Sequence, residues 1–501
     1  MCRTLAAAAR LIAVASLTAP LALPAQAQIE DIVITAERRE ASLQETPISI
    51  SAFTGDDLVQ NGIQDTEQLT GFTPGLVIQR DVIGKVVIRG VGTENFTVAG
   101  DPGVAVSVDG AYISRSNVAI FDLFDMERVE VLRGPQGTLY GRNATGGAIN
   151  FITRKPTEET ETRFQVDVGN YNKFRAEAAV SGSITENGGL RGRVAGMVHK
   201  RDGFTENVFP SVGRGLEELD TKDLWALRGQ LAWTAGNVDF NLSGDYYKDE
   251  SRPIPYKYTD DPITSSGLGD LANPLAGQLR TVSQGFETDV PGTGRSSLGA
   301  AGLWEQGGVN LTIDWALSDD VALRSITAFR NFQFQWINDG DGVEDFAVNY
   351  AQDDDSDLIT QEIQLFSTTD SAFSWIGGLY FLGEESTTRI DIPIAPFGSG
   401  VFNDGTAETT AYAIFGQASW DFTDSLRLNL GARYSYEEKK VDYVNTFFFE
   451  PPTPVNLKDD WNAFTPKIGL DWFVSDDVMF FGSITQGFKS GGFNLLAVSY
   501  T

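Results

Sequence analysis

The pattern of hydrophobic and polar positions alternates strictly from about residue 162 onward. Apolar side chains occupy every second position, as at Leu426, Leu428 and Leu430, and polar side chains such as Arg427 and Asn429 stand between them. A period of two places the two kinds of side chain on opposite faces of a β-strand. We therefore predict a large β-structure over this part of the chain.

The alternation predicts about 13 strands, and the connections between them indicate what they form. Short turns at one end and long loops at the other are typical of a transmembrane barrel, whereas alternation alone also fits a soluble sandwich. Every second connection is short, as at 318–320 and 423–425. Long connections are predicted at residues 201–221, 248–301, 336–355, 386–407 and 439–462. The predicted strands are residues 162–169, 173–184, 190–200, 222–234, 237–247, 302–317, 321–335, 356–368, 373–385, 408–422, 426–438, 463–473 and 478–486.

The first 27 residues have the pattern of an export signal. Two arginines lie at or before position 10, an apolar stretch covers residues 11–23, and residues 25–27 read Ala-Gln-Ala, a small-x-small cleavage site. The apolar stretch is too short to span a bilayer permanently. We predict a signal peptide at 1–27, which removes Cys2 from the mature protein.

Residues 28–46 form a polar, mostly extended segment with four consecutive β-formers, Ile32 to Thr35. This short strand has no evident partner in the neighbouring sequence. It is either a strand available to a partner protein or the first strand of the domain that follows, and the pattern leaves both open.

Residues 47–156 are predicted to form a compact α+β domain with one helical pattern from Asp56 to Gly71. Glycine recurs between residues 134 and 147, which indicates tight turns or close backbone contacts rather than a long helix. Short strands are expected at 86–88, 104–109 and 129–132.

Charge and composition exclude several classes of function. The chain has 38 Lys and Arg against 68 Asp and Glu, and loss of the two signal-peptide arginines gives a net charge of 36 − 68 = −32. So acidic a chain repels nucleic-acid phosphates, and no nucleic-acid partner is expected. With a single His, His199, and a single Cys, a His/Cys metal site is not expected. Motifs of nucleotide-binding and hydrolytic sites are missing, so we expect no enzyme, no metal and no cofactor.

Residues 129–156 carry the most specific motif. The stretch from Glu130, EVLRGPQGTLYGRNATGGAINFITRKP, closely resembles the plug signature of TonB-dependent outer-membrane receptors. Its signature positions, with an upstream plug motif at residues 88–90, are Arg89, Gly90, Arg133, Gly134, Pro135, Gly137, Gly141, Gly146 and Gly147. The segment near the N-terminus that resembles a TonB box is Asp31, Ile32, Val33, Ile34, Thr35 and Ala36. Stretches that resemble barrel motifs are residues 360–365, 431–434 and 486–494.

The resemblance implies an all-β transmembrane barrel, 22-stranded in the family, with an N-terminal α+β plug domain inside the lumen. It implies a receptor in the outer membrane of a Gram-negative bacterium, in contact with outer-membrane lipid, that imports a small-molecule ligand. The TonB box would pair by strand addition with the periplasmic TonB energy-transducing complex. The expected domains are a signal peptide at 1–27, a TonB box and linker at 28–46, a plug domain at 47–156 and an incomplete barrel at 157–501.

About 13 strands cannot close a barrel of 22. At the predicted spacing of the strands, roughly 225 further residues are expected beyond Thr501. An open barrel edge in lipid leaves backbone polar groups unsatisfied. We therefore interpret the sequence as lacking the last part of its barrel.

Buried arginines in a lumen require carboxylate partners, and plug arginines in the family pair with barrel glutamates. The resemblance implies that Arg89 and Arg133 are such arginines and that Glu362 is the partner that latches the plug. The alternative is a solvated lumen face without a specific pair.

Ligand contacts are expected in the long loops, where exposed aromatic side chains can stack on a planar or sugar-like ligand. These aromatic residues are Tyr256 and Tyr258 in the longest loop and Phe447, Phe448 and Phe449 in a proline-rich one. Packing between loops or an interfacial aromatic girdle is the alternative interpretation.

An acidic loop is expected at Asp339, Asp341, Glu344, Asp345 and Asp353 to Asp355. Its spacing lacks the glycine and closing glutamate of a calcium-binding loop, so we expect it to be solvated. His199 is expected at the outer end of a strand, as an ordinary residue that faces the lumen.

Uptake of a ferric siderophore is the default function that the resemblance implies. An oligosaccharide, an aromatic compound or a cobalamin-type ligand would use the same machine, because loops set the specificity. A passive porin is opposed by the plug signature and the TonB box, and a barrel-embedded hydrolase by the missing nucleophile motifs.

Overall fold

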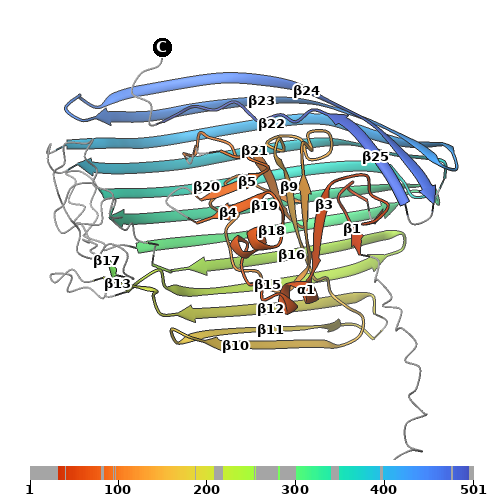
Figure 1. Cartoon of the computed structure of the whole chain (residues 1–501), viewed down its shortest axis with the longest axis horizontal. Helices are drawn as coiled ribbons and strands as arrows, with labels where there is room; N and C mark the ends of the chain where they lie inside the picture. Colours follow the sequence, from red (N-terminus) through yellow and green to blue (C-terminus); the bar gives the residue numbers. More distant parts are fainter. Residues whose placement is uncertain are drawn as a thin grey trace, which may run out of the picture.

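The computed structural model describes residues 32–495 except 40, 81–83, 94, 96, 187, 208–217, 253, 255–279, 282–300, 340–348, 370, 395–398 and 476–477. Its main element is an antiparallel sheet of 13 strands in which each strand pairs with the next (Figure 1). We call this sheet the wall. The strands are β10 (Glu161–Gly169), β11 (Lys173–Ser183), β12 (Leu190–Arg201), β15 (Lys222–Ala235), β16 (Val238–Asp249), β18 (Ala301–Ala316), β19 (Val321–Asp339), β20 (Asn349–Ser367), β21 (Phe373–Ile394), β22 (Ser399–Thr423), β23 (Leu426–Phe447), β24 (Thr453–Ser475) and β25 (Val478–Thr485).

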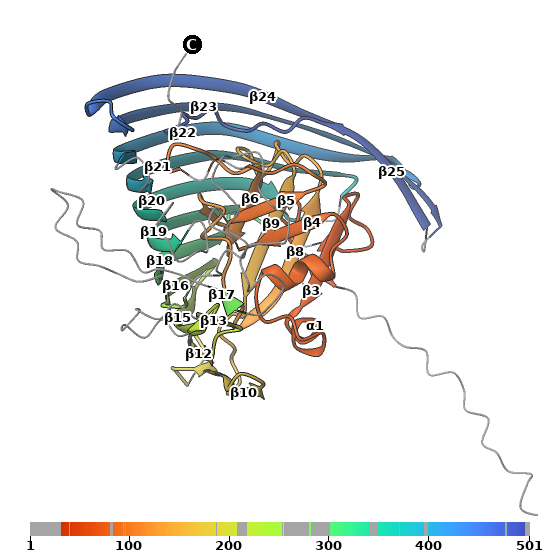
Figure 2. The ribbon, with the colours of Figure 1, turned by 60° about the vertical axis from the view of Figure 1, so that its left-hand side comes forward.

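The two faces of the wall differ as the alternation predicts. Leu227, Ile414 and Leu430 lie on the outer face and are 48–60% exposed, whereas Arg433 and Glu437 point inward and are buried. The wall curves around a smaller unit, so its inner face is covered while its apolar outer face is not (Figure 2). Among the described residues, no helix is long and apolar enough to cross a membrane.

All 13 predicted strands are present, but several are longer than predicted. Most of the residues predicted as loops at 386–407 and 439–462 belong to β21–β24. Here the alternation continues with inverted polarity: Asp404 and Glu408 point outward, whereas Val441 and Tyr443 are buried on the inner face. The predicted strands were recognised by apolar residues at outward positions, so each predicted strand ends too early, where this inversion begins.

The smaller unit, which we call the plug unit, is built on a five-stranded sheet in the order β3–β8–β9–β6–β7. Alternate residues of its central strands, such as Val129, Val131, Ile149 and Phe151, are fully or almost fully buried in its core. The strands are β3 (Ile50–Thr54), β6 (Val104–Val108), β7 (Ala111–Ile113), β8 (Met126–Arg133) and β9 (Gly147–Thr153), with a separate hairpin of β4 (Leu76–Gln79) and β5 (Lys85–Ile88).

The helical pattern over residues 56–71 forms two short helices instead of one. They are α1 (Gly55–Gln60), which begins with a capping box between Thr54 and Asp57, and the 3₁₀ helix η1 (Glu67–Gly71). The break follows α1 at Gly62, whose φ of 68° is left-handed and cannot continue a helix. Outside the wall and the plug unit, β13 (Thr205–Asn207), β14 (Glu218–Leu219) and β17 (Arg280–Thr281) form a small sheet at the long-loop end.

Charged substitutions on the outer face test whether it contacts lipid. Ile414→Arg places a cation at an exposed apolar position of β22, and we expect it to destabilise the barrel in a bilayer by about 2–4 kcal/mol. The measurement is urea unfolding of the full-length protein in lipid vesicles. Asp404→Arg, on the same strand beyond the polarity inversion, is the matched control and should change stability little. Equal effects of the two substitutions would contradict a lipid-facing belt.

Candidate functional site

The glycine-rich signature forms the turn between β8 and β9 and lies against the wall. Within the turn, the N–H of Gly134 donates to the carbonyl oxygen of Gly146 over 2.9 Å. Gly141 has a φ of 75°, and a Cβ there would lie 2.5 Å from the guanidinium carbon of Arg433 on β23. Glycine is favoured at this position because the left-handed backbone strains other residues, and a Cβ would also displace the buried Arg433 guanidinium.

Arg142, in the same turn, belongs to a buried charge cluster between the plug unit and β23. Its guanidinium lies 2.7 Å from Asp101 and 3.3 Å from Glu437, while the Lys439 ammonium donates to Asp101 over 2.5 Å. Each of these four side chains is at most 3% exposed. Burial by itself raises the pKa of Asp101, but the charges of Arg142 and Lys439 outweigh it and hold this pKa well below its usual range. Asp101 therefore stays ionised and holds both cations.

A second buried ion pair joins the plug unit to β21. Arg115 lies 2.9 Å from a carboxylate oxygen of Glu384, and the Ser114 hydroxyl donates to the same carboxylate over 2.7 Å. Arg115 also donates to the hydroxyl of Ser386 over 3.1 Å. The plug unit is thus fixed to two neighbouring regions of the wall through arginines.

The expected pairing of Arg89 and Arg133 with Glu362 is wrong. Arg89 donates to the hydroxyl of Ser49 over 3.0 Å, and Arg133 donates to the carbonyl of Pro74 over 3.5 Å. Arg89 lies in an exposed turn and Arg133 ends β8 half-buried, so neither needs a carboxylate from the wall. The buried plug arginines that reach wall glutamates are Arg115 and Arg142, and Arg142 stands in the quoted signature but was passed over.

Glu362 instead pairs with the N-terminal segment, residues 32–46. Arg38 lies 3.5 Å from Glu362 on β20. The neighbouring Glu37 accepts hydrogen bonds from Lys467 of β24 over 3.1 Å and from Gln417 of β22 over 3.0 Å. The segment is therefore fastened to three strands of the wall.

The segment is also fastened to the plug unit. The Thr35 N–H donates to Glu130 over 2.7 Å, and the Tyr140 hydroxyl donates to the carbonyl of Ala36 over 3.1 Å. The guanidinium of Arg38 stacks over the ring of Tyr140, 4.6 Å from its centroid. These contacts bring the N-terminal segment to the signature turn.

The expected unpaired strand is paired in the structure. β1 (Val33–Ile34) forms a hairpin with β2 (Ala41–Ser42), and Ile34 and Ala36 are almost completely buried. Asp31 and the predicted signal peptide lie outside the described residues. The partner strand was missed because Ala41 and Ser42 are weak β-formers, which the buried environment overrides.

Residues 486–494, expected as a barrel motif, leave the wall after β25 and lie against the signature turn. The Asn143 N–H donates to the carbonyl of Phe488 over 2.9 Å, and the Ser490 N–H donates to the Asn143 side chain over 3.0 Å. This stretch therefore contributes to the seat of the plug unit.

His199 faces the lumen, as predicted, but it contacts the plug unit instead of an open pore. Its Nδ1 lies 2.6 Å from a carboxylate oxygen of Asp122, and Lys222 donates to the other oxygen over 2.9 Å. Burial raises the pKa of Asp122, while the charge of Lys222 and the hydrogen bond and charge of His199 together lower it well below its usual range. His199 and Lys222 thus hold a fully buried plug carboxylate at β12 and β15.

The expected aromatic contacts have mixed outcomes. Tyr256 and Tyr258 lie outside the described residues. Phe447 ends β23 and stacks edge-on with Phe448 at 4.6 Å, and Phe449 in the following turn is 77% exposed. Their role as ligand contacts stays a prediction.

The sequence reasoning missed an aromatic ladder on the inner face, near the long-loop ends of β18 and β19. Its members are Trp304, Phe332, Phe334 and Trp336, all at most 6% exposed, with neighbouring ring centroids 5.6–6.3 Å apart. The indole N–H groups of Trp304 and Trp336 have no hydrogen-bond acceptor among the described residues. The signal was present, because aromatic side chains occupy alternate positions from 332 to 336 beyond the apolar outer belt.

The acidic loop is partly a strand. Asp353 to Asp355 belong to β20, and Asp354 is buried on the inner face, where it accepts hydrogen bonds from Thr388 over 2.5 Å and from Gln352 over 2.6 Å. Asp341, Glu344 and Asp345 lie outside the described residues. In the part of the chain that the structure describes, no three His, Cys, Asp or Glu side chains are arranged to hold a metal ion.

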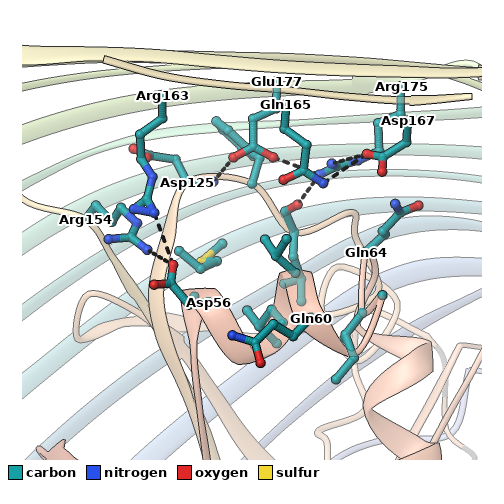
Figure 3. A pocket seen from close by; sticks show the side chains of 18 of the residues that line it. Asp56, Gln60, Gln64, Asp125, Arg154, Arg163, Gln165, Asp167, Arg175 and Glu177 are labelled. Atoms are coloured by element: carbon teal, nitrogen blue, oxygen red, sulfur yellow. Dashed lines mark hydrogen bonds and ion pairs between the residues drawn. The ribbon is translucent and has the colours of Figure 1, made fainter. Parts of the chain in front are cut away.

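A polar cavity of about 550 Å³ separates α1 from β10 and β11 (Figure 3). Arg154 and Arg163 both approach the carboxylate of Asp56, at 3.2 and 3.1 Å, and Arg175 lies 3.0 Å from Glu177. The arginines that line this cavity are thus already paired with carboxylates, as the dashed lines in Figure 3 show. Its charges hold the plug unit and the wall together and leave no cation for a ligand.

Arg142 tests the importance of the buried cluster. Arg142→Ala leaves Glu437 without its cation, and we expect a loss of about 3–5 kcal/mol in the free energy of unfolding because a buried charge loses its partner. Chemical unfolding of the full-length protein, followed by tryptophan fluorescence, measures this loss. Arg133→Ala is the matched control and should cost less than about 1 kcal/mol, since it removes one long hydrogen bond. A small effect at Arg142 would show that the cluster does not hold the plug.

Family models match two parts of the chain. The model described as "TonB dependent receptor-like, beta-barrel" matches residues 251–500, and the "TonB-dependent Receptor Plug Domain" matches residues 42–148. The pesticin receptor of Yersinia pestis is 24% identical over 499 residues, which cover 97% of this chain and 68% of that relative. The ferripyoverdine receptor of Pseudomonas aeruginosa is 32% identical over 193 residues, which cover 38% of this chain and 23% of that relative.

Solved structures agree in fold. The ferric yersiniabactin uptake receptor of Yersinia pestis superimposes with a TM-score of 0.77 at 19% identity, covering 91% of this chain and 67% of that one. The ferric-catecholate import receptor Fiu of E. coli K12, in its open form, gives a TM-score of 0.68 at 14% identity, covering 89% of this chain and 70% of that one. With its plug unit seated against a curved, outwardly apolar wall, the chain belongs to the TonB-dependent receptors.

Proposed function

We propose that the protein imports a ferric siderophore across the outer membrane by a TonB-dependent rearrangement of its plug. One observation carries this proposal: the N-terminal segment is fastened both to the plug unit, through Thr35 and Glu130, and to the wall, through Arg38 and Glu362. A pull on the segment therefore acts directly on the contacts that seat the plug. A passive porin has no need of such a connection.

The partner in this proposal is the TonB complex, which would take residues 31–36 by strand addition. Strand addition needs free backbone groups, whereas β1 is paired with β2 and Ile34 and Ala36 are buried. The hairpin must therefore open before the partner binds. The structure fits a resting state in which the coupling segment is withheld.

The proposed ligand class follows the relatives, which are described as receptors for pesticin, ferripyoverdine and ferric yersiniabactin. The ferric ion is cargo inside its chelate, so no protein metal site is needed. We propose that Tyr256, Tyr258 and Phe447 to Phe449 contact the ligand at the long-loop end. There the buried indole N–H groups of Trp304 and Trp336 offer donors for the oxygen atoms of a chelate once the plug rearranges.

The proposed location is the outer membrane, where the apolar outer face of the wall would meet lipid. We also propose the domain limits given above, with the signal peptide at 1–27, the coupling segment at 28–46, the plug at 47–156 and the barrel from 157. An oligosaccharide, an aromatic compound and a cobalamin-type ligand are the competing substrates that transport assays must separate.

Ile34→Pro tests the energy coupling. Proline lacks the N–H that strand pairing uses, so uptake should fall to the uncoupled background while ligand still binds at the cell surface. The measurement is the binding and uptake of iron-55 chelates from the culture medium of the iron-starved source organism. Glu45→Pro, at an exposed turn of the same segment, is the control and should import normally. Normal uptake by the Ile34→Pro variant would show that the segment does not couple energy to transport.

Iron starvation tests the ligand class. The abundance of the protein in isolated outer membranes should rise several-fold in iron-starved over iron-replete cells, because a scavenging receptor serves the cell only when iron is scarce. Quantitative mass spectrometry measures the change. An unchanged abundance would remove iron as the cargo and would leave the receptor architecture standing.

A further inference from the structure

The contacts between the plug unit and the wall are unevenly distributed around the wall. Buried ion pairs attach the plug unit or the N-terminal segment to β12, β15 and the long-loop end of β16 on one side and to β20, β21, β23 and β24 on the other. Between these regions, no ion pair joins the plug unit to β18 or β19 in the described part of the chain. One hydrogen bond spans this gap, from the Asn310 side chain to the carbonyl of Asp109 over 3.0 Å.

We call β18 and β19 the weakly attached sector. The charged side chains on the inner face of this sector are paired within the wall itself. Arg324 lies 2.5 Å from Asp314, and Arg330 lies 2.8 Å from Asp245. They do not need the plug unit to satisfy their charges. Separating the plug unit from β18 and β19 therefore leaves no buried charge without its partner, whereas separating it from the ion-paired strands does.

A polar cavity of about 170 Å³ already lies in this sector, between the plug unit and the inner face of β15–β20. On its wall side the cavity is bordered by small polar side chains, Asn241, Ser243, Asn310 and Thr312, and by the ion pair of Asp314 and Arg324. They lie toward the short-turn ends of their strands, the end from which the N-terminal segment enters. The cavity is large enough for several waters, each of which takes about 30 Å³.

The N-terminal segment forms part of the lining of this cavity. Thr35 and Arg38 border it, together with Tyr140 of the signature turn and Gln364 of β20. The contact of Arg38 with Glu362 therefore closes the cavity at the border between the weakly attached sector and the ion-paired one. Removal of the segment therefore enlarges this cavity.

We propose that the ligand path through the lumen runs along β18 and β19, and that the N-terminal segment is its lid through Thr35 and Arg38. This inference rests on the proposed import function and adds to it the place where the plug separates from the wall. In the short-turn half of the path, the side chains that line the cavity suit a hydrated, oxygen-rich solute, because hydroxyl and amide groups can replace its water contacts there.

Conductance of the full-length receptor in planar phosphatidylcholine bilayers tests the path, with potassium chloride as the permeating solute. We compare the intact lid with a deletion of residues 32–39 and with Arg38→Ala, which keeps the fold if the deletion does not. Each of these three proteins carries a single cysteine on the inner face of the wall, in a background without other cysteines. The cysteine is introduced as Ser243→Cys, in the lining of the polar cavity, or as Ser435→Cys, on the ion-paired side.

Opening the lid should raise the conductance, and a charged thiosulfonate reagent should then block it at Ser243→Cys but not at Ser435→Cys. Modification of Ser243→Cys should also become about tenfold faster, since losing one charged hydrogen bond shifts an opening equilibrium by that order. Equal block at both positions would show that the whole plug leaves its seat. Conductance without block at Ser243→Cys would place the path elsewhere, and unchanged conductance in both lid variants would rule out the lid.

This measurement uses no siderophore, so its outcome does not depend on whether the proposed ligand is correct. If the wild type does not take up iron-55 chelates but the block occurs as expected, the proposed ligand is wrong and the proposed path stands. Normal uptake with equal block at both cysteines would keep the function and overturn the path.

Discussion

The structure depends on one constraint: charges that are buried between the plug unit and the wall must have partners. Asp101 holds Arg142 and Lys439, and Asp122 holds Lys222 and His199. Removing Asp101 or Asp122 leaves a buried lysine or arginine without its carboxylate, which costs more than an ordinary hydrogen bond. The seat of the plug is therefore specific, because few positions of the plug satisfy all of these charges together.

The same constraint explains why the interface can be both firm and able to open. A plug held by ion pairs on every side would resist any local movement. In β18 and β19 the inner charges pair within the wall, so the plug can separate from these strands without leaving a buried charge unpaired. The firmly held part of the interface and the part that can separate thus lie on different strands of the wall.

Much of the fold could be predicted from the sequence, because each strand of the wall has an apolar outer face and a polar inner face. The prediction ended too early at β21–β24, where the polarity inverts and an outward aspartate at 404 follows the same geometry as an outward isoleucine at 414. The site was harder to predict. The pairing of Arg142 with Glu437 joins residues almost 300 positions apart, and no local pattern encodes which of several arginines is buried. The burial of Ile34 likewise depends on the assembled lumen and not on its neighbours in sequence.

The hairpin of β1 and β2 has a mechanical consequence. Its pairing covers two residues in each strand, and a force applied from the N-terminal side loads these few hydrogen bonds in succession. Such a hairpin peels open at low force. Next along the chain, Thr35 and Ala36 are hydrogen-bonded to Glu130 and Tyr140 of the plug unit, and Glu37 and Arg38 are ion-paired with β24 and β20. These contacts bear the load together once the hairpin has opened. Brief thermal forces therefore open only the hairpin, whereas a sustained pull is transmitted to the contacts that hold the plug unit.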